Sequence, residues 1–196
     1  MREKYYLKIN PKAFFRPKDW NAFYDSLKEK SRPYFKIAIN TGGRINEIRE
    51  VRVKDIDFDN KTLTFYTTKT KGAKGEKRPV PREIKLSTEF LNWLQRWIKI
   101  NKLSQNDAFK IPSTAGVKKI LQTHLKKIQI KDWHDFSSHN VRKTHGNWLL
   151  AIGMDGMKVA ARLGHDYNTL LKSYVSPDIF TEEDKVLIKQ VLGDLI

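Results

Sequence analysis

The chain has 196 residues, no cysteine, and 38 lysines and arginines against 22 acidic residues, which gives a formal net charge of +16. This length suits one domain with a sizeable hydrophobic core, and the lack of cysteine excludes a disulfide framework and a thiolate zinc site. A cationic excess of this size favours a polyanionic partner, with nucleic acid first and a merely solvated lysine-rich surface as the alternative.

The N-terminal part of the chain predicts helices. The first ten residues, MREKYYLKIN, lack the apolar region of a secretory signal. No stretch approaches the ~20 apolar residues of a membrane span, so we expect an intracellular protein with no membrane partner. Residues 16–30 fit an amphipathic helix that begins at Pro17. A second helix is expected from about Pro33 to the turn at 41–43, and a short third one over 44–51.

The middle of the chain changes to a β-rich pattern. Residues 62–68, TLTFYTT, predict one strand, and residues 77–81, KRPVP, a second short one. Between them, residues 69–78 carry five cations and one acid and are typical of a hairpin turn. Pro79 and Pro81 favour an edge position, because proline cannot donate to a sheet ladder.

Two helices with apolar stripes come next. Ser87 is a good N-cap for the first, TEFLNWLQRWIKI. Its buried face is expected to be Phe90, Leu91, Leu94, Trp97 and Ile98. The second helix has the stripe Val117, Ile120, Leu121, Leu125 and Ile128. That stripe leaves four cations facing outward, Lys118, Lys119, Lys126 and Lys127.

The last third of the chain again predicts helices. One spans 137–152 with Ser137 or Ser138 as its cap, a second spans 155–163 and ends at the following glycine, and a short third one covers 168–175. The whole pattern indicates an α+β class that is mostly α-helical, with a small antiparallel sheet.

Residues 181–196 predict an amphipathic C-terminal helix. Thr181 and Asp184 have the spacing of a capping box. The apolar side consists of Leu187, Ile188, Val191, Leu192 and Leu195. Such a stripe requires a groove, which can belong to its own domain or to a neighbouring protomer.

Several residues have the chemistry needed to transfer a DNA phosphodiester to a tyrosine. Arginines hold the non-bridging oxygens, a lysine protonates the leaving oxygen, and histidines donate or accept protons without a metal. Arg44 follows a Gly-Gly turn at a helix start, where N–H groups also attract phosphate. His139 and Arg142 share a helix face, and Tyr174 follows His165 by nine positions. Each of these residues, taken alone, can be explained by a structural role. Their occurrence together and in this order favours a catalytic role.

The set resembles the tyrosine recombinases of the phage-integrase superfamily over roughly residues 16–180. TGGRINEI resembles the box of the first catalytic arginine, HNVRKTH the His-x-x-Arg box, and LGHDYNTLLKSYV the Leu-Gly-His box with its nucleophile. The matching positions are Arg44 with Glu47, then His139 and Arg142, then His165 and Tyr174. Gly43 departs from the bulky aliphatic residue usual there, and His145 falls where the family varies, so it receives no role.

The resemblance implies a role for each residue. Tyr174 would form a 3′-phosphotyrosyl link and release a 5′-hydroxyl, while Arg44 and Arg142 clamp the phosphate. His139 would assist the tyrosine's proton, and His165 would donate to a non-bridging oxygen. Lys69 is the expected general acid, with two other lysines of the basic turn, Lys71 and Lys74, left open. No metal and no cofactor are expected.

The resemblance also implies partners and domains. The expected partner is double-stranded DNA at a specific recombination site, bound through Lys71, Lys74, Lys77, Arg78, Lys118, Lys119, Lys126 and Lys127. A tetramer on DNA would exchange the tail between protomers. Residues 1–15 are expected to be a lead-in or linker, 16–180 the catalytic domain without the family's core-binding domain, and 181–196 the tail helix. The expected location is the cytoplasm, at the nucleoid, or the host cytoplasm if the source is viral.

The first functional expectation is integration and excision of a viral or mobile genome, ahead of chromosome-dimer resolution. A type IB topoisomerase shares the chemistry, but the apolar tail argues against it. A non-catalytic DNA-binding module is the alternative from another class, and the intact catalytic set speaks against it. A metal-dependent nuclease is disfavoured, because the acidic residues do not cluster.

Overall fold

The computed structural model describes residues 14–67, 80–168, 170 and 177–195. Within this part of the chain, the α-helices are α2 (Pro17–Ser26), α3 (Arg32–Thr41), α4 (Ile45–Glu50), α5 (Thr88–Ile100), α6 (Thr114–Lys127), α7 (Ser138–Ala151), α8 (Gly156–Leu163) and α10 (Glu182–Leu192). Short 3-10 turns occupy Glu29–Ser31, Val53–Asp55, Trp133–Asp135 and Pro177–Ile179. The predicted α+β class, mostly helical with a small antiparallel sheet, is confirmed.

The sheet contains β1 (Ile56–Asp57), β2 (Thr62–Thr67) and β3 (Val80–Lys85), antiparallel and in that order among the described residues. The sequence predicts the second strand over 77–81, and the predicted end is wrong because β3 continues to Lys85; residues 77–79 lie outside the described residues. The extension of the strand is not predicted because most of its residues are polar or exposed, and Ile84 is its one fully buried residue. Pro81 lies on the edge strand opposite Tyr66, as predicted, whereas Pro79 is outside the described residues.

The first helix is shorter than predicted. It begins at Pro17, as expected, but ends at Ser26 and does not reach residue 30. The Ser26 hydroxyl donates to the carbonyl of Phe23 at 2.7 Å, and Leu27 turns to an extended conformation in which its side chain joins the core. Burial of that leucine outweighs continuation of the helix into the lysine- and glutamate-rich residues that follow.

Other helix ends lie where their capping signals place them. The Ser87 side chain accepts a hydrogen bond from the N–H of Phe90, Ser137 is the N-cap of α7, and Thr181 forms a capping box at the start of α10. α8 ends at Gly164, which has the left-handed φ of 63°. Local capping chemistry is thus reliable in this chain.

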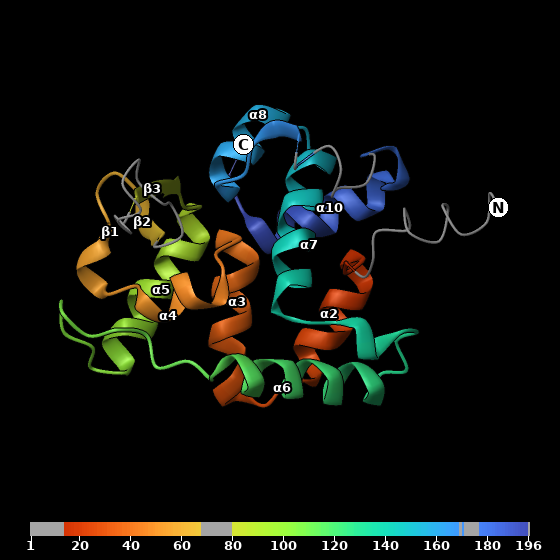
Figure 1. Cartoon of the computed structure of the whole chain (residues 1–196), viewed down its shortest axis with the longest axis horizontal. Helices are drawn as coiled ribbons and strands as arrows, with labels where there is room; N and C mark the ends of the chain where they lie inside the picture. The colour runs from red at the N-terminus through yellow and green to blue at the C-terminus, as the bar shows by residue number, and fades with distance from the viewer. Residues whose placement is uncertain (1–13, 68–79, 169, 171–176, 196) are drawn as a thin grey trace, which may run out of the picture.

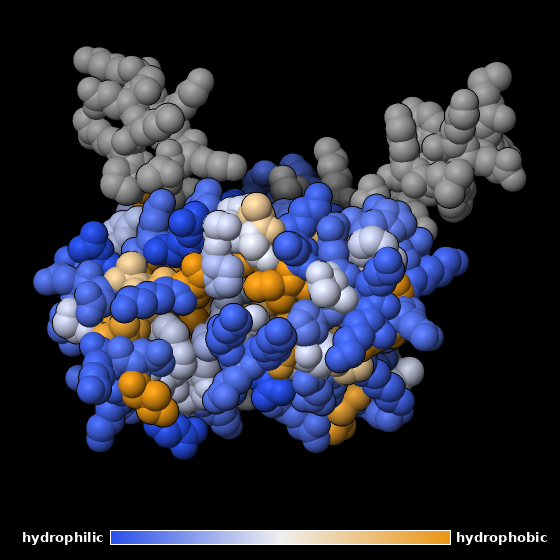
Figure 2. All heavy atoms as spheres, turned by 90° about the horizontal axis from the view of Figure 1, so that it is seen from below, coloured by the Kyte–Doolittle hydropathy of each residue, from blue (hydrophilic) through white to orange (hydrophobic). Residues whose placement is uncertain are grey.

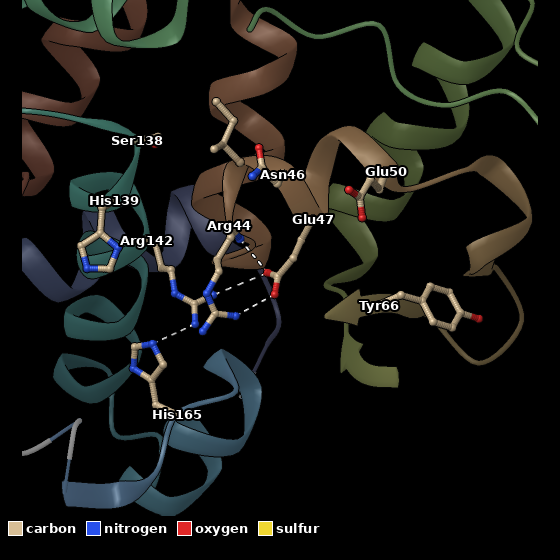
Figure 3. Close-up of a pocket in the computed structure, with 10 residues that line it drawn as sticks. Arg44, Asn46, Glu47, Glu50, Tyr66, Ser138, His139, Arg142 and His165 are labelled. Atoms are coloured by element: carbon tan, nitrogen blue, oxygen red, sulfur yellow. Dashed lines mark hydrogen bonds and ion pairs between the residues drawn. The ribbon is translucent and has the colours of Figure 1, made fainter. Parts of the chain in front are cut away.

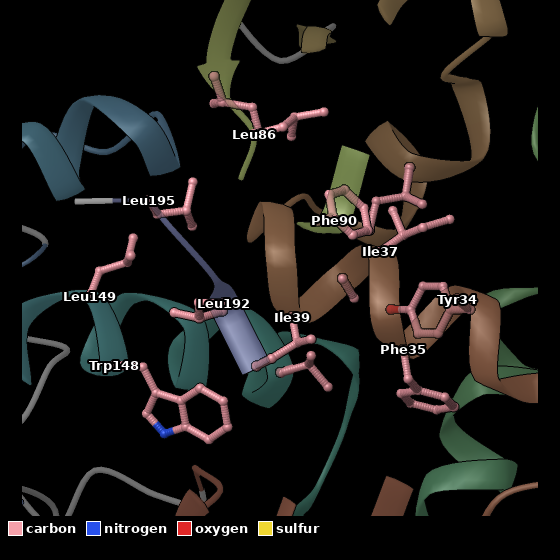
Figure 4. Packing of buried hydrophobic residues seen from close by; sticks show 14 of the residues in the cluster. Tyr34, Phe35, Ile37, Ile39, Leu86, Phe90, Trp148, Leu149, Leu192 and Leu195 are labelled. Atoms are coloured by element: carbon pink, nitrogen blue, oxygen red, sulfur yellow. The ribbon is translucent and has the colours of Figure 1, made fainter. Parts of the chain in front are cut away.

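The helices α3 and α7 lie side by side at the centre of the molecule (Figure 1). Both are buried on most of their sides, including polar positions such as Asn40 and Thr144. α6 crosses one end of this pair, while the sheet with α4 and α5 lies on the opposite flank from α2 and α10 (Figure 1). Figure 4 shows the packing around the pair, with Phe35 and Ile39 on α3 and Trp148 on α7. Side chains that project from these two helices are therefore held on closely packed, rigid backbone.

The C-terminal helix packs against its own chain. α10 contacts α2, α3 and α7, and its Ile188 and Leu192 are fully buried, with Leu195 beyond the helix also in the core (Figure 4). The Asp194 carboxylate accepts hydrogen bonds from the N–H and the hydroxyl of Thr88, both at 2.7 Å. Of the two grooves that the sequence left open, this structure has the tail in the one on its own domain. Exchange of the tail between protomers on DNA stays a prediction.

The outer side of α6 is strongly hydrophilic. Figure 2 views the molecule from the end that α6 crosses, and hydrophilic residues cover most of that face, with smaller apolar areas between them. The four lysines predicted to point outward from α6 are all exposed: Lys118, Lys119, Lys126 and Lys127. In the described part of the chain, no helix combines the length and the apolar character that crossing a membrane requires.

Candidate active site

A close turn after α3 sets the position of Arg44. Gly42 ends α3 with a φ of 62°, and a Cβ there would lie 2.5 Å from the ring of His145. A Cβ on Gly43 would lie 2.7 Å from Phe65 and 2.8 Å from Ile48. Only glycine fits both positions, which explains the absence of a bulky aliphatic residue before the arginine. Arg44 then becomes the N-cap of α4.

Glu47 holds Arg44 in place from within the same helix. Its carboxylate accepts the backbone N–H of Arg44 and one guanidinium nitrogen, each at 2.7 Å. A second arginine, Arg82 on β3, donates to the same carboxylate at 2.7 Å. Burial would raise the pKa of the Glu47 carboxyl, but the charge of Arg82 and the hydrogen bonds from Arg44 outweigh it and lower the pKa below its usual value.

Arg142 projects from α7 toward the same place and is almost completely buried, with 1% of its side chain exposed. It donates to the carbonyls of Gly42, at 2.7 Å, and Leu163. One of its nitrogens lies 3.8 Å from the Glu47 carboxylate. A buried cation with this many fixed acceptors has one orientation, as phosphate recognition by a guanidinium requires.

His165 lies directly beyond Arg142. Its Nε2 is 3.0 Å from an Arg142 nitrogen, and since a guanidinium only donates, Nε2 accepts and the ring proton is on Nδ1. Burial, together with the charges of Arg142 and Arg44, lowers the pKa of His165 to about 4. The imidazole is therefore neutral at neutral pH.

His139 occupies the first turn of α7 and is exposed. Displacement of water by the surrounding protein and the charges of Lys143, Arg142 and Arg44 lower its pKa below the usual value. A neutral imidazole can accept a proton at its unprotonated ring nitrogen.

These side chains surround a cavity of about 400 Å³ (Figure 3). It is lined by Arg44, Ile45, Asn46, Glu47, Glu50, Tyr66, Ser138, His139, Arg142 and His165. In Figure 3, Arg44 and Arg142 lie at its centre, with His139 and His165 on the α7 side and Tyr66 on the side of the sheet. The cavity thus combines two guanidiniums with two histidines, a set able to bind a phosphate group and exchange protons with it.

Four of the six predicted catalytic residues are brought together here: Arg44, His139, Arg142 and His165. The remaining two, Lys69 and Tyr174, lie outside the described residues, as do the predicted DNA contacts Lys71, Lys74, Lys77 and Arg78. The exposed lysines of α6 are not among the residues that line the cavity. Among the residues that the structure describes, no three His, Cys, Asp or Glu side chains gather as a metal site would need.

Sequence reasoning missed Arg162 and His145, which are buried beside the site, and Arg82, whose side chain is 10% exposed. The Arg162 guanidinium donates to the carbonyls of Lys85 and Asn40 and to the His145 ring. The register of the sheet could have identified Arg82. This arginine pairs with Phe65 on β2, just as Ile84 pairs with Leu63 two residues away. With the correct strand bounds, alternation would have placed Arg82 on the inner face.

Comparison with known proteins agrees with this geometry. The profile of the Phage integrase family matches residues 13–179. The tyrosine recombinase XerA of Pyrococcus furiosus is 28% identical over 145 residues, which cover 70% of this chain and 47% of XerA. The chain thus spans about half the length of that relative.

Solved structures share the fold. The Tn1549 transposon integrase in complex with transposon right end DNA superposes with a TM-score of 0.66 at 18% identity, covering 94% of this chain and 67% of that one. The crystal structure of XerA recombinase superposes with a TM-score of 0.63 at 14% identity, covering 91% of this chain and 64% of that one. XerH recombinase bound to its difH substrate superposes with a TM-score of 0.61 at 20% identity, covering 83% of this chain and 50% of that one.

Proposed function

The chain belongs to the phage integrase family, and we propose that it is the catalytic domain of a site-specific tyrosine recombinase. It cleaves and rejoins double-stranded DNA through a 3′-phosphotyrosine intermediate. The observation that carries this proposal is the convergence of Arg44, Arg142, His139 and His165 on one cavity, although they come from distant parts of the sequence.

The reaction is an in-line displacement at phosphorus. Arg44 and Arg142 hold the non-bridging oxygens, and His165 supplies a further hydrogen bond there. Tyr174 attacks, so that a bond forms between phosphorus and the phenolic oxygen and the bond to the 5′ oxygen breaks. His139 accepts the phenolic proton. Lys69, with Lys71 and Lys74 as alternatives, protonates the departing 5′ oxygen.

Neither metal nor cofactor takes part, because fixed guanidiniums neutralise the charge of the transition state. In the resting site Arg142 and Arg44 already converge beside Glu47. The partner is a specific recombination site, held through the hairpin cations and the lysines of α6. The chain assembles as a tetramer on that DNA, in the cytoplasm, and its biological role is integration and excision of a viral or mobile genome.

The test is a suicide assay with a nicked duplex of the recombination site, which traps the covalent adduct. The Tyr174→Phe variant is expected to bind DNA and form no adduct, because phenylalanine lacks the hydroxyl that attacks the phosphate. Tyr167→Phe is the matched control: this exposed tyrosine precedes the nucleophile by seven positions and its replacement should leave the adduct unchanged. EDTA should not inhibit.

Each arm of the assay has a contrary outcome. An adduct formed by Tyr174→Phe would exclude Tyr174 as the nucleophile. Loss of cleavage with EDTA, restored by added Mg²⁺, would exclude the metal-free mechanism. A wild-type chain that binds the site and never becomes covalently attached would be a DNA-binding module.

A further inference from the structure

Three arginines from three elements meet at the C-terminal end of α8. Arg82 from β3 donates to the carbonyl of Arg162, Arg142 from α7 to that of Leu163, and Arg44 from the start of α4 to that of Gly164, at 3.5 Å. Carbonyls at a helix C-terminus have no partner within the helix and carry the negative end of its dipole. This helix end therefore stabilises guanidiniums that would otherwise repel one another.

Arg82 differs from the other two because it does not line the cavity. Its side chain is 10% exposed, and its guanidinium lies over the Phe65 ring at 4.8 Å. Gly164 packs against it so closely that a Cβ there would be 3.0 Å from the arginine side chain. Arg82 is therefore fixed behind the cavity and cannot itself receive the phosphate.

The contact that links Arg82 to the cavity is Glu47. The same carboxylate oxygen accepts from Arg82 and from the backbone N–H of Arg44, and the other oxygen accepts from the Arg44 side chain. A protonated carboxyl would lose acceptor capacity and could not hold both groups of Arg44. Glu47 is 5% exposed, so its carboxylate needs cations beside it to remain ionised and to keep holding Arg44.

We propose that Arg82 is a positioning residue for DNA cleavage, acting through Glu47 to hold Arg44 in the orientation that receives the phosphate. This inference rests on the proposed function. It also connects β3, at the base of the predicted hairpin that carries the candidate general acids, to α4 and α8.

The prediction concerns the protonation of Glu47, which three charged groups face. They are Arg44 from the start of α4, Arg82 from β3 and Arg142 from α7, with His165 on the far side of Arg142. Without Arg82, the buried carboxyl should take up a proton at higher pH. Cleavage should then fall as the pH is lowered through a range where the wild type is unaffected.

The experiment compares Arg82→Met, Glu47→Gln and the double variant, with Arg96→Met, an exposed arginine of α5, as the matched control. Adduct formation on the suicide substrate is measured from pH 5 to 9. Arg82→Met should slow cleavage about tenfold at neutral pH, the size expected for a lost hydrogen bond to a charged group, and more at acidic pH. In the Glu47→Gln background the same substitution should change the rate by less than about twofold, because coupled residues are not additive.

A second readout does not depend on activity. In protein labelled with ¹³C at the glutamate carboxyl carbons, the Glu47 signal, assigned by its loss in Glu47→Gln, should titrate at higher pH in Arg82→Met than in the wild type. If Arg82→Met does not fold, Arg82→Gln, which also removes the charge but keeps a polar side chain, is measured in the same way.

The outcomes separate the two proposals. A wild type without any adduct refutes the proposed function, while the carboxyl titration still reports the link between Arg82 and Glu47. An unchanged Glu47 titration, or an equal loss of cleavage with and without Glu47 at every pH, overturns the role of Arg82.

Discussion

Arg44 and Arg142 have the same side chain in different surroundings. Arg142 is 1% exposed and hydrogen-bonded to two carbonyls from distant parts of the chain, whereas Arg44 is 30% exposed and pairs within its own helix. Arg142→Ala should lower the free energy of unfolding by about 3 kcal/mol, because buried acceptors lose their donor. Arg44→Ala should cost about 1 kcal/mol or less. Urea titrations of both variants measure these losses in the free energy of unfolding. Equal losses would show that Arg142 contributes no more to stability than Arg44 does.

His165 makes folding sensitive to acid. Its pKa is about 4 in the folded chain, against 6.5 in an unfolded one. Since the unfolded state binds the proton more readily, stability falls as the pH is lowered from about 6.5 to about 4. In His165→Asn this decline should be smaller by about 2 kcal/mol, after allowance for solvent screening of a half-buried group.

The control for this titration is His134→Asn, at a histidine that is 62% exposed. It should follow the wild-type curve. His145, fully buried and with its pKa well below the usual value because of burial and the charge of Arg162, retains part of the acid sensitivity in every variant. If urea midpoints of His165→Asn and the wild type decline in parallel, His165 is not held neutral by the fold.

The residues that could be predicted from the sequence are those defined by order and spacing. Arg44, His139, Arg142 and His165 stand at recognisable intervals, and the cavity contains all four. Arg82 could not be found in this way, because its partners, Glu47 and the Arg162 carbonyl, are 35 and 80 residues away. Strand alternation with the correct bounds would have placed Arg82 on the inner face of the sheet, but it would not have identified Glu47 as its partner.

The same difference holds for helices and strands. Helices with a capping residue end where predicted, as Ser87, Ser137 and Gly164 show. The predicted ends of the first helix and of β3 are wrong, because tertiary burial of Leu27 and Ile84 decides where these elements end.

The helix α10 belongs to the core of this chain, so its removal should be costly. Deletion of residues 181–196 exposes the core where Ile188 and Leu192 were buried, and the absence of each side chain costs about 2–3 kcal/mol. We expect the truncated chain to unfold at a much lower temperature and to bind a hydrophobic dye. Truncation should therefore impair folding and DNA binding, and its effect should not be confined to strand exchange between protomers.

A milder change tests the end of the tail. Asp194→Asn should cost about 1 kcal/mol, the size of a helix cap, because the carboxylate accepts two hydrogen bonds at the start of α5. Glu183→Gln is the control, since that side chain is exposed and makes one surface ion pair. If full truncation leaves the melting temperature unchanged, the tail is not part of the folded core.

For the molecule as a whole, charge determines DNA affinity. With a net charge of +16 and contacts to about five phosphates, the logarithm of the binding constant should fall with a slope of roughly −4 to −5 against the logarithm of salt concentration. Glutamine at the four exposed lysines of α6 should make this slope shallower by about 0.9 for each phosphate that is no longer neutralised. Glutamine at Lys54, Lys99 and Lys102, exposed lysines outside α6, is the control, and identical slopes in all three proteins would exclude α6 from the interface.

The carbonyls at the end of α8 also bear on how tightly an anion is held. An arginine side chain has about 2 kcal/mol of rotamer entropy to lose when it is immobilised by a ligand. Here the guanidinium of Arg142, which lines the cavity, is already immobilised by the backbone carbonyls of Gly42 and Leu163. A phosphate entering the cavity therefore meets donors whose freedom was given up during folding, and the free energy of those contacts remains available for the transition state.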